Sequence, residues 1–147
     1  MQINLHRSQW KVFNAKAKVR VVVAGRGFGK TRFLRASAIR SVLTYKGKFD
    51  PESPCEAVII APTLKMARSL HWDSLVDLFA DNPLVDHIDR TYLRIYFKNN
   101  LPSLSLAGVD DGGERLRGKN LIYAGCDEYQ LFPSRTWAEI ITPCFRD

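Results

Sequence analysis

The first 49 residues of this 147-residue chain contain no aspartate or glutamate, although they hold 12 lysines and arginines. The remaining residues hold 10 basic and 15 acidic side chains, so the formal net charge of +7 comes from the N-terminal third. An acid-free basic segment attracts anions, which include nucleotides and nucleic acids. The alternative is that these charges lie on solvated helix surfaces. Both interpretations stay open for a contact with DNA.

Cysteines and long apolar runs are also scarce. Cys55, Cys126 and Cys144 are odd in number and widely spaced, so they fit neither a disulfide framework nor a zinc site. No apolar run approaches the ~20 residues of a membrane span, and no signal peptide opens the sequence. The predicted compartment is therefore the reducing cytoplasm. Hydrophobic residues make up 46% of the chain, which favours one globular domain.

The stretch from Val19 to Arg32, VRVVVAGRGFGKTR, joins a β-branched run, a glycine-rich turn and the start of a helix. The valines predict a buried strand. Gly25, Gly27 and Gly29 allow successive backbone N–H groups to face an anion, and the following helix adds the positive end of its dipole. This order of elements is typical of a phosphate-binding loop.

Lys30 and Thr31 complete the loop pattern. The strict form is G-x-x-x-x-G-K-S/T, and Ala24 stands at its first position. Lys30 is predicted to reach the β- and γ-phosphates of ATP, and the Thr31 hydroxyl to ligate Mg²⁺. The alternative is a tight glycine-rich turn that binds no ligand. The predicted nucleotide-binding loop residues are Gly25, Arg26, Gly27, Phe28, Gly29, Lys30 and Thr31.

Two adjacent carboxylates close another apolar run, LIYAGCDE, which predicts a buried strand over 121–128. Asp127 is predicted to hold Mg²⁺ through water, and Glu128 to polarise the water that attacks the γ-phosphate. A phosphate loop needs both functions for hydrolysis. The alternative is an exposed acidic turn.

Three further side chains are candidates around the nucleotide. Gln9 lies upstream of the loop, and its amide can both donate to and accept from an adenine edge; an exposed helical glutamine is the equal alternative. Arg26 within the loop, or Arg117 in the segment RLRG, would neutralise charge on the γ-phosphate, from the same subunit or a neighbour. For Arg117, a surface or DNA-phosphate arginine is the equal alternative. His71 is predicted to be structural.

Hydrophobic patterns predict the other elements. A short N-terminal helix is predicted with Ser8 as its N-cap. Further helices are predicted over 32–45, 64–80 and 134–145. A buried strand is predicted over 56–63, and alternating segments over 90–98 and 101–109 predict a hairpin.

Several of these features together resemble the large terminase subunit of tailed bacteriophages, the motor ATPase that packages DNA into procapsids. They are Gln9, the arginine-bearing loop AGRGFGKT, the strand end Ala61-Pro62-Thr63, the RLRG segment, the strand ending CDE and the closing ITPCFRD. The resemblance implies one RecA-like (ASCE) P-loop α/β domain over 1–147. Its sheet is expected to be mostly parallel, flanked by helices and interrupted by a β-hairpin insertion. The implied activity is Mg²⁺-dependent ATP hydrolysis that drives packaging of double-stranded DNA.

The resemblance also implies a homo-oligomeric ring that works with a portal and a small terminase subunit in a bacterial host cell, away from membranes. In that family a coupling motif, further strands and a nuclease domain follow the carboxylate pair, whereas this chain ends at Asp147. We therefore expect a fragment or a naturally short product with an incomplete sheet, no nuclease site and weak turnover alone. The alternatives are a helicase-like nucleic-acid-dependent ATPase and a non-catalytic nucleotide-binding fragment.

Overall fold

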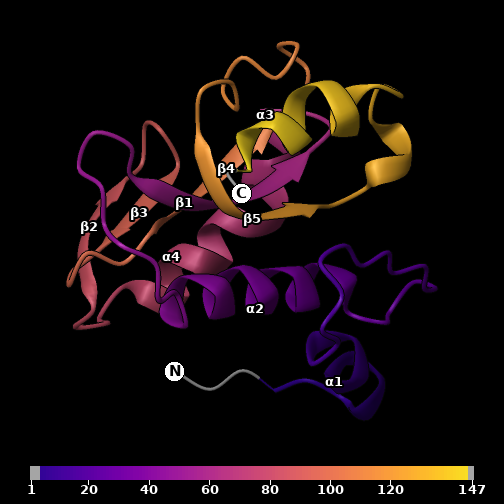
Figure 1. The fold of residues 1–147 in the computed structure, drawn as a ribbon. Coiled ribbons are helices and arrows are strands. Elements are labelled where there is room, and N and C mark those ends of the chain that lie inside the picture. Colours follow the sequence, from indigo (N-terminus) through magenta and orange to yellow (C-terminus); the bar gives the residue numbers. More distant parts are fainter. Residues whose placement is uncertain (1–3, 146–147) are drawn as a thin grey trace.

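A five-stranded sheet forms the centre of the computed structural model, which describes residues 4–145 (Figure 1). The strands are β1 (Cys55–Ala61), β2 (Val85–Asp89), β3 (Arg94–Phe97), β4 (Ser103–Gly108) and β5 (Asn120–Cys126). Their order across the sheet is β2-β3-β4-β1-β5. The β4-β1-β5 part is parallel, and β2 and β3 extend it in antiparallel fashion. The predicted α/β fold with an inserted hairpin is confirmed.

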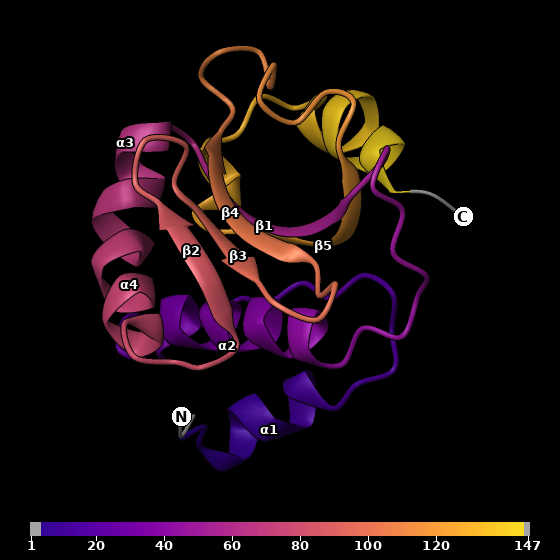
Figure 2. The same cartoon turned by 90° about the vertical axis from the view of Figure 1, so that its left-hand side faces the viewer.

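Helices and turns cover both faces of this sheet (Figure 2). The helices are α1 (Arg7–Phe13), α2 (Lys30–Leu43), α3 (Leu64–Ala67), a π-helical turn η1 (Arg68–Trp72) and α4 (Asp73–Phe79). Short turns follow β5, namely η2 (Tyr129–Leu131), η3 (Trp137–Ile141) and η4 (Thr142–Cys144). Among the described residues, no helix has the length and apolar character needed to cross a bilayer.

The core divides into two layers because successive side chains of a strand point to opposite faces. Ala57, Ile59 and Ala61 of β1 pack with α2 and the α3–α4 helix. Val58 and Ile60 of the same strand pack against the 110–119 loop and the turns after β5. All five side chains are fully buried. An apolar run that is buried on both faces is what the sequence of β1 predicts.

The carboxyl ends of β1, β4 and β5 lie at the same edge of the sheet, since these strands are parallel. Ala61 pairs with Gly108, the last residue of β4, and the Asp127 N–H donates to the Ile60 carbonyl at 2.8 Å. Residues that follow these strands are therefore brought together at one edge.

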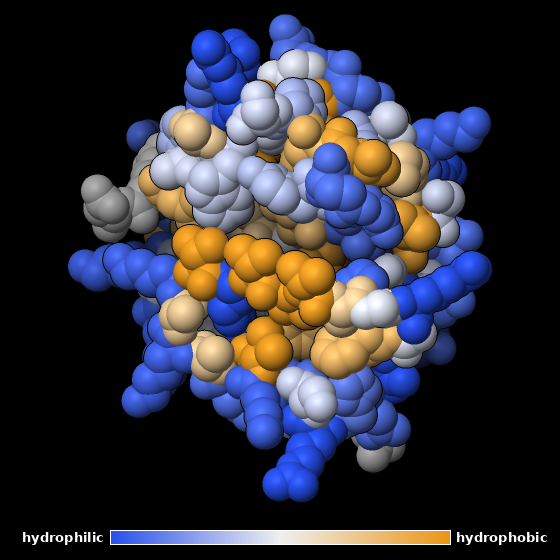
Figure 3. All heavy atoms as spheres, turned by 90° about the vertical axis from the view of Figure 1, so that its right-hand side faces the viewer, coloured by the Kyte–Doolittle hydropathy of each residue, from blue (hydrophilic) through white to orange (hydrophobic). Residues whose placement is uncertain are grey.

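The predicted buried strand at Val19–Val23 is wrong. This segment pairs with no strand within residues 4–145, and Val19, Val21 and Val23 are 59%, 85% and 94% exposed. The β preference of valine is realised only where a neighbouring strand and a packed face support it. On its outer edge, β5 has no strand partner in the described part of the chain. Figure 3 shows apolar side chains gathered on the side of the molecule that lies at the right in Figure 1.

Other boundaries differ in smaller ways. The N-cap of α1 is His6 and not Ser8, because the His6 ring accepts from the Gln9 N–H while the Gln9 side chain accepts from the His6 N–H. Strand β2 was not predicted, because its sequence VDHID is polar and its side chains are only partly buried. The helix predicted over 134–145 is a π turn followed by a 3₁₀ turn.

Candidate active site

The phosphate-loop sequence lies between the extended valine segment and the start of α2. Gly27 and Gly29 have φ angles of 87° and 77°, which a residue with a Cβ rarely adopts. Gly29 is the N-cap of α2, and no side chain caps the first N–H groups of this 14-residue helix. Free N–H groups and the helix dipole at this position suit an anion.

The Lys30 ammonium lies across this loop. Its Nζ donates to the Ala24 carbonyl at 2.6 Å and to the Gly25 carbonyl at 3.3 Å. Backbone carbonyls are neutral acceptors, so phosphate oxygens would form stronger, charge-assisted bonds with the same ammonium. Lys30 is therefore already positioned at the mouth of the loop.

Thr31 and Asp127 meet although 96 residues separate them in the chain: the Thr31 Oγ1 donates to Asp127 Oδ2 at 3.1 Å. Thr31 lies in the first turn of α2, and Asp127 directly follows β5. Asp127 is buried, and its Oδ1 accepts from the Glu128 N–H at 3.1 Å. The fold thus brings a hydroxyl and a carboxylate together beside the phosphate loop.

His71 also contacts this carboxylate, which was not predicted from the sequence. Its Nε2 lies 3.2 Å from Asp127 Oδ2, and the imidazole is fully buried. The His71 contact lowers the pKa of the Asp127 carboxyl; Thr31 and the Glu128 N–H act in the same direction, and burial opposes them. The only available signal was a histidine at a core-facing position of the helix after β1.

Glu128 adopts a left-handed backbone conformation with φ of 52°. A side chain other than glycine, asparagine or aspartate rarely takes this conformation, and such strain is frequent at functional sites. Its half-buried carboxylate accepts a hydrogen bond from Gln130. Asp127 thus contacts Thr31 and His71, whereas the Glu128 carboxylate contacts Gln130 in the turn that follows it.

Gln9 is buried against the phosphate loop. Its Nε2 donates to the carbonyls of Phe28 at 2.8 Å and Gly29 at 3.3 Å, and its Oε1 accepts from the His6 N–H at 3.0 Å. A cavity of about 420 Å³ adjoins these residues and is lined by residues 4–6 before α1, by Gln9, by residues 27–29 of the loop and by Arg32. These hydrogen bonds hold α1 against the phosphate loop, and Gln9 also lines the cavity beside the loop.

Neither of the two candidate arginines, Arg26 and Arg117, forms a hydrogen bond or ion pair with Thr31 or Asp127. Both are exposed, and neither side chain forms an ion pair or hydrogen bond within residues 4–145. Arg26 lies in the phosphate loop itself. Arg117 precedes the first residue of β5, whereas Asp127 follows the last. Seven strand residues at ~3.3 Å each put roughly 20 Å between these ends.

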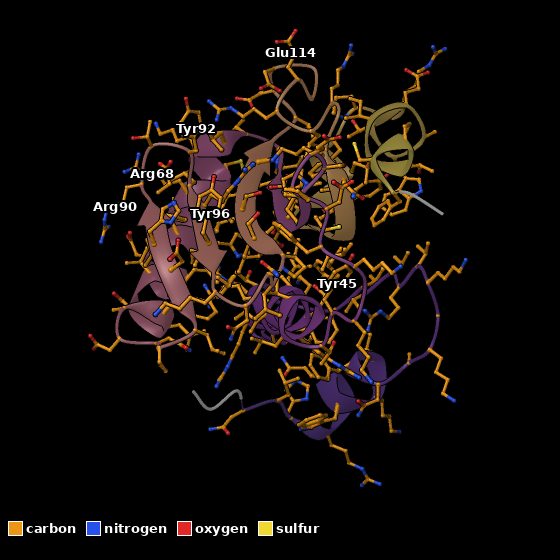
Figure 4. The ribbon with its side chains drawn as sticks, turned by 60° about the vertical axis from the view of Figure 1, so that its left-hand side comes forward. Tyr45, Arg68, Arg90, Tyr92, Tyr96 and Glu114 are labelled. Atoms are coloured by element: carbon orange, nitrogen blue, oxygen red, sulfur yellow. The ribbon has the colours of Figure 1, made fainter. Side chains whose placement is uncertain are left out.

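A second cavity, of about 640 Å³, lies at the amino ends of β1, β4 and β5, away from the phosphate loop. Tyr45 and Tyr96 line it (Figure 4). Beneath it, the buried Glu56 carboxylate pairs with Arg94 at 2.9 Å and with Lys119, whose pKa is lowered by burial. One carboxylate thus pairs with two cations here, in ion pairs that hold the amino ends of the strands together, and the size of this cavity alone does not identify it as a phosphate site.

No protein-family model matches the chain, and no curated protein sequence matches it significantly. Among solved structures, the large terminase ATPase domain of Thermus phage P74-26 matches 96% of the chain with a TM-score of 0.71 and 23% identity. An arginine-to-alanine mutant of that domain matches at 0.72 with the same identity and coverage. The chain has the fold of a large terminase ATPase domain. It spans 60% of the length of those matched chains.

Proposed function

We propose that this chain binds and hydrolyses ATP as part of a large terminase motor that drives double-stranded DNA into procapsids. The observation that carries the proposal is the contact between Thr31 Oγ1 and Asp127 Oδ2 beside an uncapped helix N-terminus. An anion site and two oxygen ligands for a cation are what a Mg²⁺–nucleotide complex requires. The terminase ATPase fold supports the same assignment.

The side chains present fit Mg²⁺. Thr31 and Asp127 offer hard oxygen ligands, and no group of three or more His, Cys, Asp and Glu side chains that could hold a metal occurs in the described chain. Mg²⁺ is typically held by one or two protein oxygens together with waters and substrate phosphates. When bound, the ion would offset the negative charge of the β- and γ-phosphates.

The protein residues would divide the remaining work. The N–H groups of the loop would hold the phosphates, with Lys30 across the β- and γ-phosphates. Glu128 would accept a hydrogen bond from a water and orient it for in-line attack on the γ-phosphate. Asp127 would be kept ionised and oriented by its hydrogen-bond donors, which lower the pKa of its carboxyl.

The contacts of Gln9 lead to a further prediction, which concerns the preference for ATP over GTP. Both of its amide hydrogens are used by the loop carbonyls, so one lone pair of Oε1 is left for a base. The exocyclic amine of adenine can donate to this oxygen, whereas the carbonyl of guanine cannot. We expect Gln9→Ala to weaken the binding of both ATP and GTP, because the phosphate loop loses its contacts with α1. We also expect the ratio of ATP to GTP affinity to fall by up to ~10-fold, which is the equivalent of one hydrogen bond.

Calorimetric titration of both nucleotides into the wild type and Gln9→Ala checks this. Thr91→Ala is the control, because Thr91 is an exposed, uncharged residue in the turn between β2 and β3, and it should leave both affinities unchanged. An unchanged ratio of ATP to GTP affinity in Gln9→Ala would show that Gln9 does not contact the base. Its role would then be limited to holding α1 against the phosphate loop.

Arg117 would act on the nucleotide of a neighbouring copy, because it lies near the opposite end of β5 from Asp127. In assemblies that hydrolyse ATP, we expect Arg117→Ala to lower turnover by ~10³-fold or more, the effect of removing an arginine finger. Mixing Arg117→Ala with Lys30→Ala should restore part of the turnover, since some interfaces then pair an intact arginine with an intact loop.

Phosphate release by each variant and by the mixture is the measurement. Arg115→Ala is the control, since Arg115 lies in the same loop and pairs only weakly with Asp111, at 3.8 Å. If the mixture is no more active than its components, Arg117 does not act on a neighbouring copy. The charge on the γ-phosphate would then be neutralised by Arg26, or by Arg117 of the chain that binds the nucleotide.

DNA contact is proposed for the acid-free N-terminal segment. Lys16 and Lys18 are exposed in the connection between α1 and the phosphate loop. If they neutralise DNA phosphates, duplex affinity should fall steeply with salt, and a double alanine variant should reduce the slope of log affinity against log salt by ~2. Fluorescence anisotropy over a salt series measures this.

The control removes two charges elsewhere, at exposed Arg90 and Arg135, and should leave the slope unchanged. Absence of duplex binding at low salt, or an affinity insensitive to salt, would show that the N-terminal lysines are solvated surface charges that do not contact DNA.

A further inference from the structure

His71 lies in an irregular part of the helix that follows β1. This helix runs from α3 through the π turn η1 into α4, and His71 and Trp72 are consecutive residues of the π turn. Both side chains are buried. A π turn widens the helix by one residue and is frequent at functional sites. Here the widened turn directs two adjacent side chains inward.

The His71 imidazole is buried without a well-aligned hydrogen-bond partner. Within residues 4–145, Nδ1 has no partner, and Nε2 lies 3.2 Å from Asp127 Oδ2 but off the line of its N–H bond. A fully buried polar ring in this state is less favourable than an apolar side chain of similar size. Packing therefore does not explain a histidine at this position.

The carboxylate that His71 faces is held on both of its oxygens. Oδ1 accepts from the Glu128 N–H, and Oδ2 accepts from the Thr31 hydroxyl with His71 Nε2 beside it. A hydroxyl rotates about its C–O bond and cannot fix the carboxylate plane alone. The backbone N–H of Glu128 fixes Oδ1, and the imidazole, which is held by the surrounding core, supplies the rigid contact on Oδ2.

We infer that His71 is a positioning residue: its ring, whose Nε2 lies 3.2 Å from Asp127 Oδ2, holds this oxygen toward Thr31 and so orients the carboxylate for the cation of a bound nucleotide. The inference rests on the proposed function, because it assumes that Thr31 and Asp127 share that cation. Residues that orient a metal ligand without touching the metal typically change metal affinity by ~10–100-fold when replaced.

Two substitutions separate this role from a structural one. His71→Gln keeps an N–H donor at about the place of Nε2, whereas His71→Leu removes it and keeps an apolar side chain in the core. The matched control is His87→Leu, because His87 is an exposed histidine that also contacts a carboxylate, that of Asp86, at 2.8 Å.

The experiment is calorimetric titration of ATP into each folded protein, with Mg²⁺ and with EDTA, together with thermal unfolding. We expect the Mg²⁺-dependent gain in ATP affinity to fall ~10-fold or more in His71→Leu, to stay within ~3-fold of wild type in His71→Gln, and to be unchanged in His87→Leu. Affinity in EDTA should be the same in all four proteins. His71→Leu should unfold at or above the wild-type temperature.

The outcomes separate the inference from the function on which it rests. A wild-type Mg²⁺ dependence that survives in His71→Leu overturns the positioning role alone. Equal losses in the Gln and Leu variants, accompanied by lower unfolding temperatures, show a structural histidine and also overturn it. A wild type whose ATP affinity does not respond to Mg²⁺ overturns the proposed function, and the positioning role with it.

Discussion

Lys30→Ala is expected to weaken binding of the ATP–Mg²⁺ complex by roughly 100-fold, because it removes the ammonium that lies across the phosphate loop. Hydrogen bonds to charged groups contribute ~1.5–3 kcal/mol each, and every ~1.4 kcal/mol is tenfold in affinity. Isothermal titration calorimetry at constant ionic strength measures the effect. The N–H groups of the loop remain, so weak binding should persist.

The control for this variant is Lys48→Ala, which removes the same charge from an exposed residue in the connection after α2. Its affinity for ATP should equal that of the wild type. If a folded Lys30→Ala protein binds as tightly as the wild type, the phosphate loop is not the nucleotide site.

Glu128→Gln is expected to preserve ATP binding and to lower the rate of phosphate release by ~10²–10⁴-fold, the range contributed by a general base. The amide has almost the shape of the carboxylate but cannot accept a proton. The backbone at Glu128 should keep its left-handed conformation, since the turn after β5 is unchanged. Single-turnover phosphate release separates this effect from substrate binding.

Glu114→Gln is the matched control, because Glu114 lies in the exposed loop between β4 and β5, at the periphery of the molecule in Figure 4. It should hydrolyse ATP at the wild-type rate. If Glu128→Gln instead loses ATP affinity while staying folded, its role is to hold the metal or the turn, and a different base must orient the water.

Continuous apolar runs and strict alternation made most of the sheet predictable. The run from Glu56 to Ala61 is buried on both faces as β1, and the alternating segments around Asn99-Asn100 form the β3–β4 hairpin. For β1 and β3 the local pattern and the final environment agree, whereas β4 alternates in sequence but is buried on both faces. The same reasoning failed at Val19–Val23, because a valine run specifies a preference for strand but not the partner that would pair with it.

The placement of Thr31 and Asp127 followed from the sequence because each is attached to the end of an element. Thr31 lies in the first turn of α2, Asp127 directly follows β5, and the carboxyl edge of a parallel sheet is where such ends converge. His71 could not be placed in the same way. Its contact with Asp127 depends on the π turn at Arg68–Trp72, and a regular helical periodicity does not predict that turn.

The most direct test of the nucleotide site is the change in backbone amide NMR shifts when a non-hydrolysable ATP analogue and Mg²⁺ are added. We expect the largest changes at residues 25–31, with a second group at Asp127 and Glu128. Small changes are expected at the amino ends of the strands, where Glu56 and Lys119 lie beside the larger cavity. Shifts concentrated around that larger cavity, with residues 25–31 unaffected, would contradict the assignment of the nucleotide to the phosphate loop.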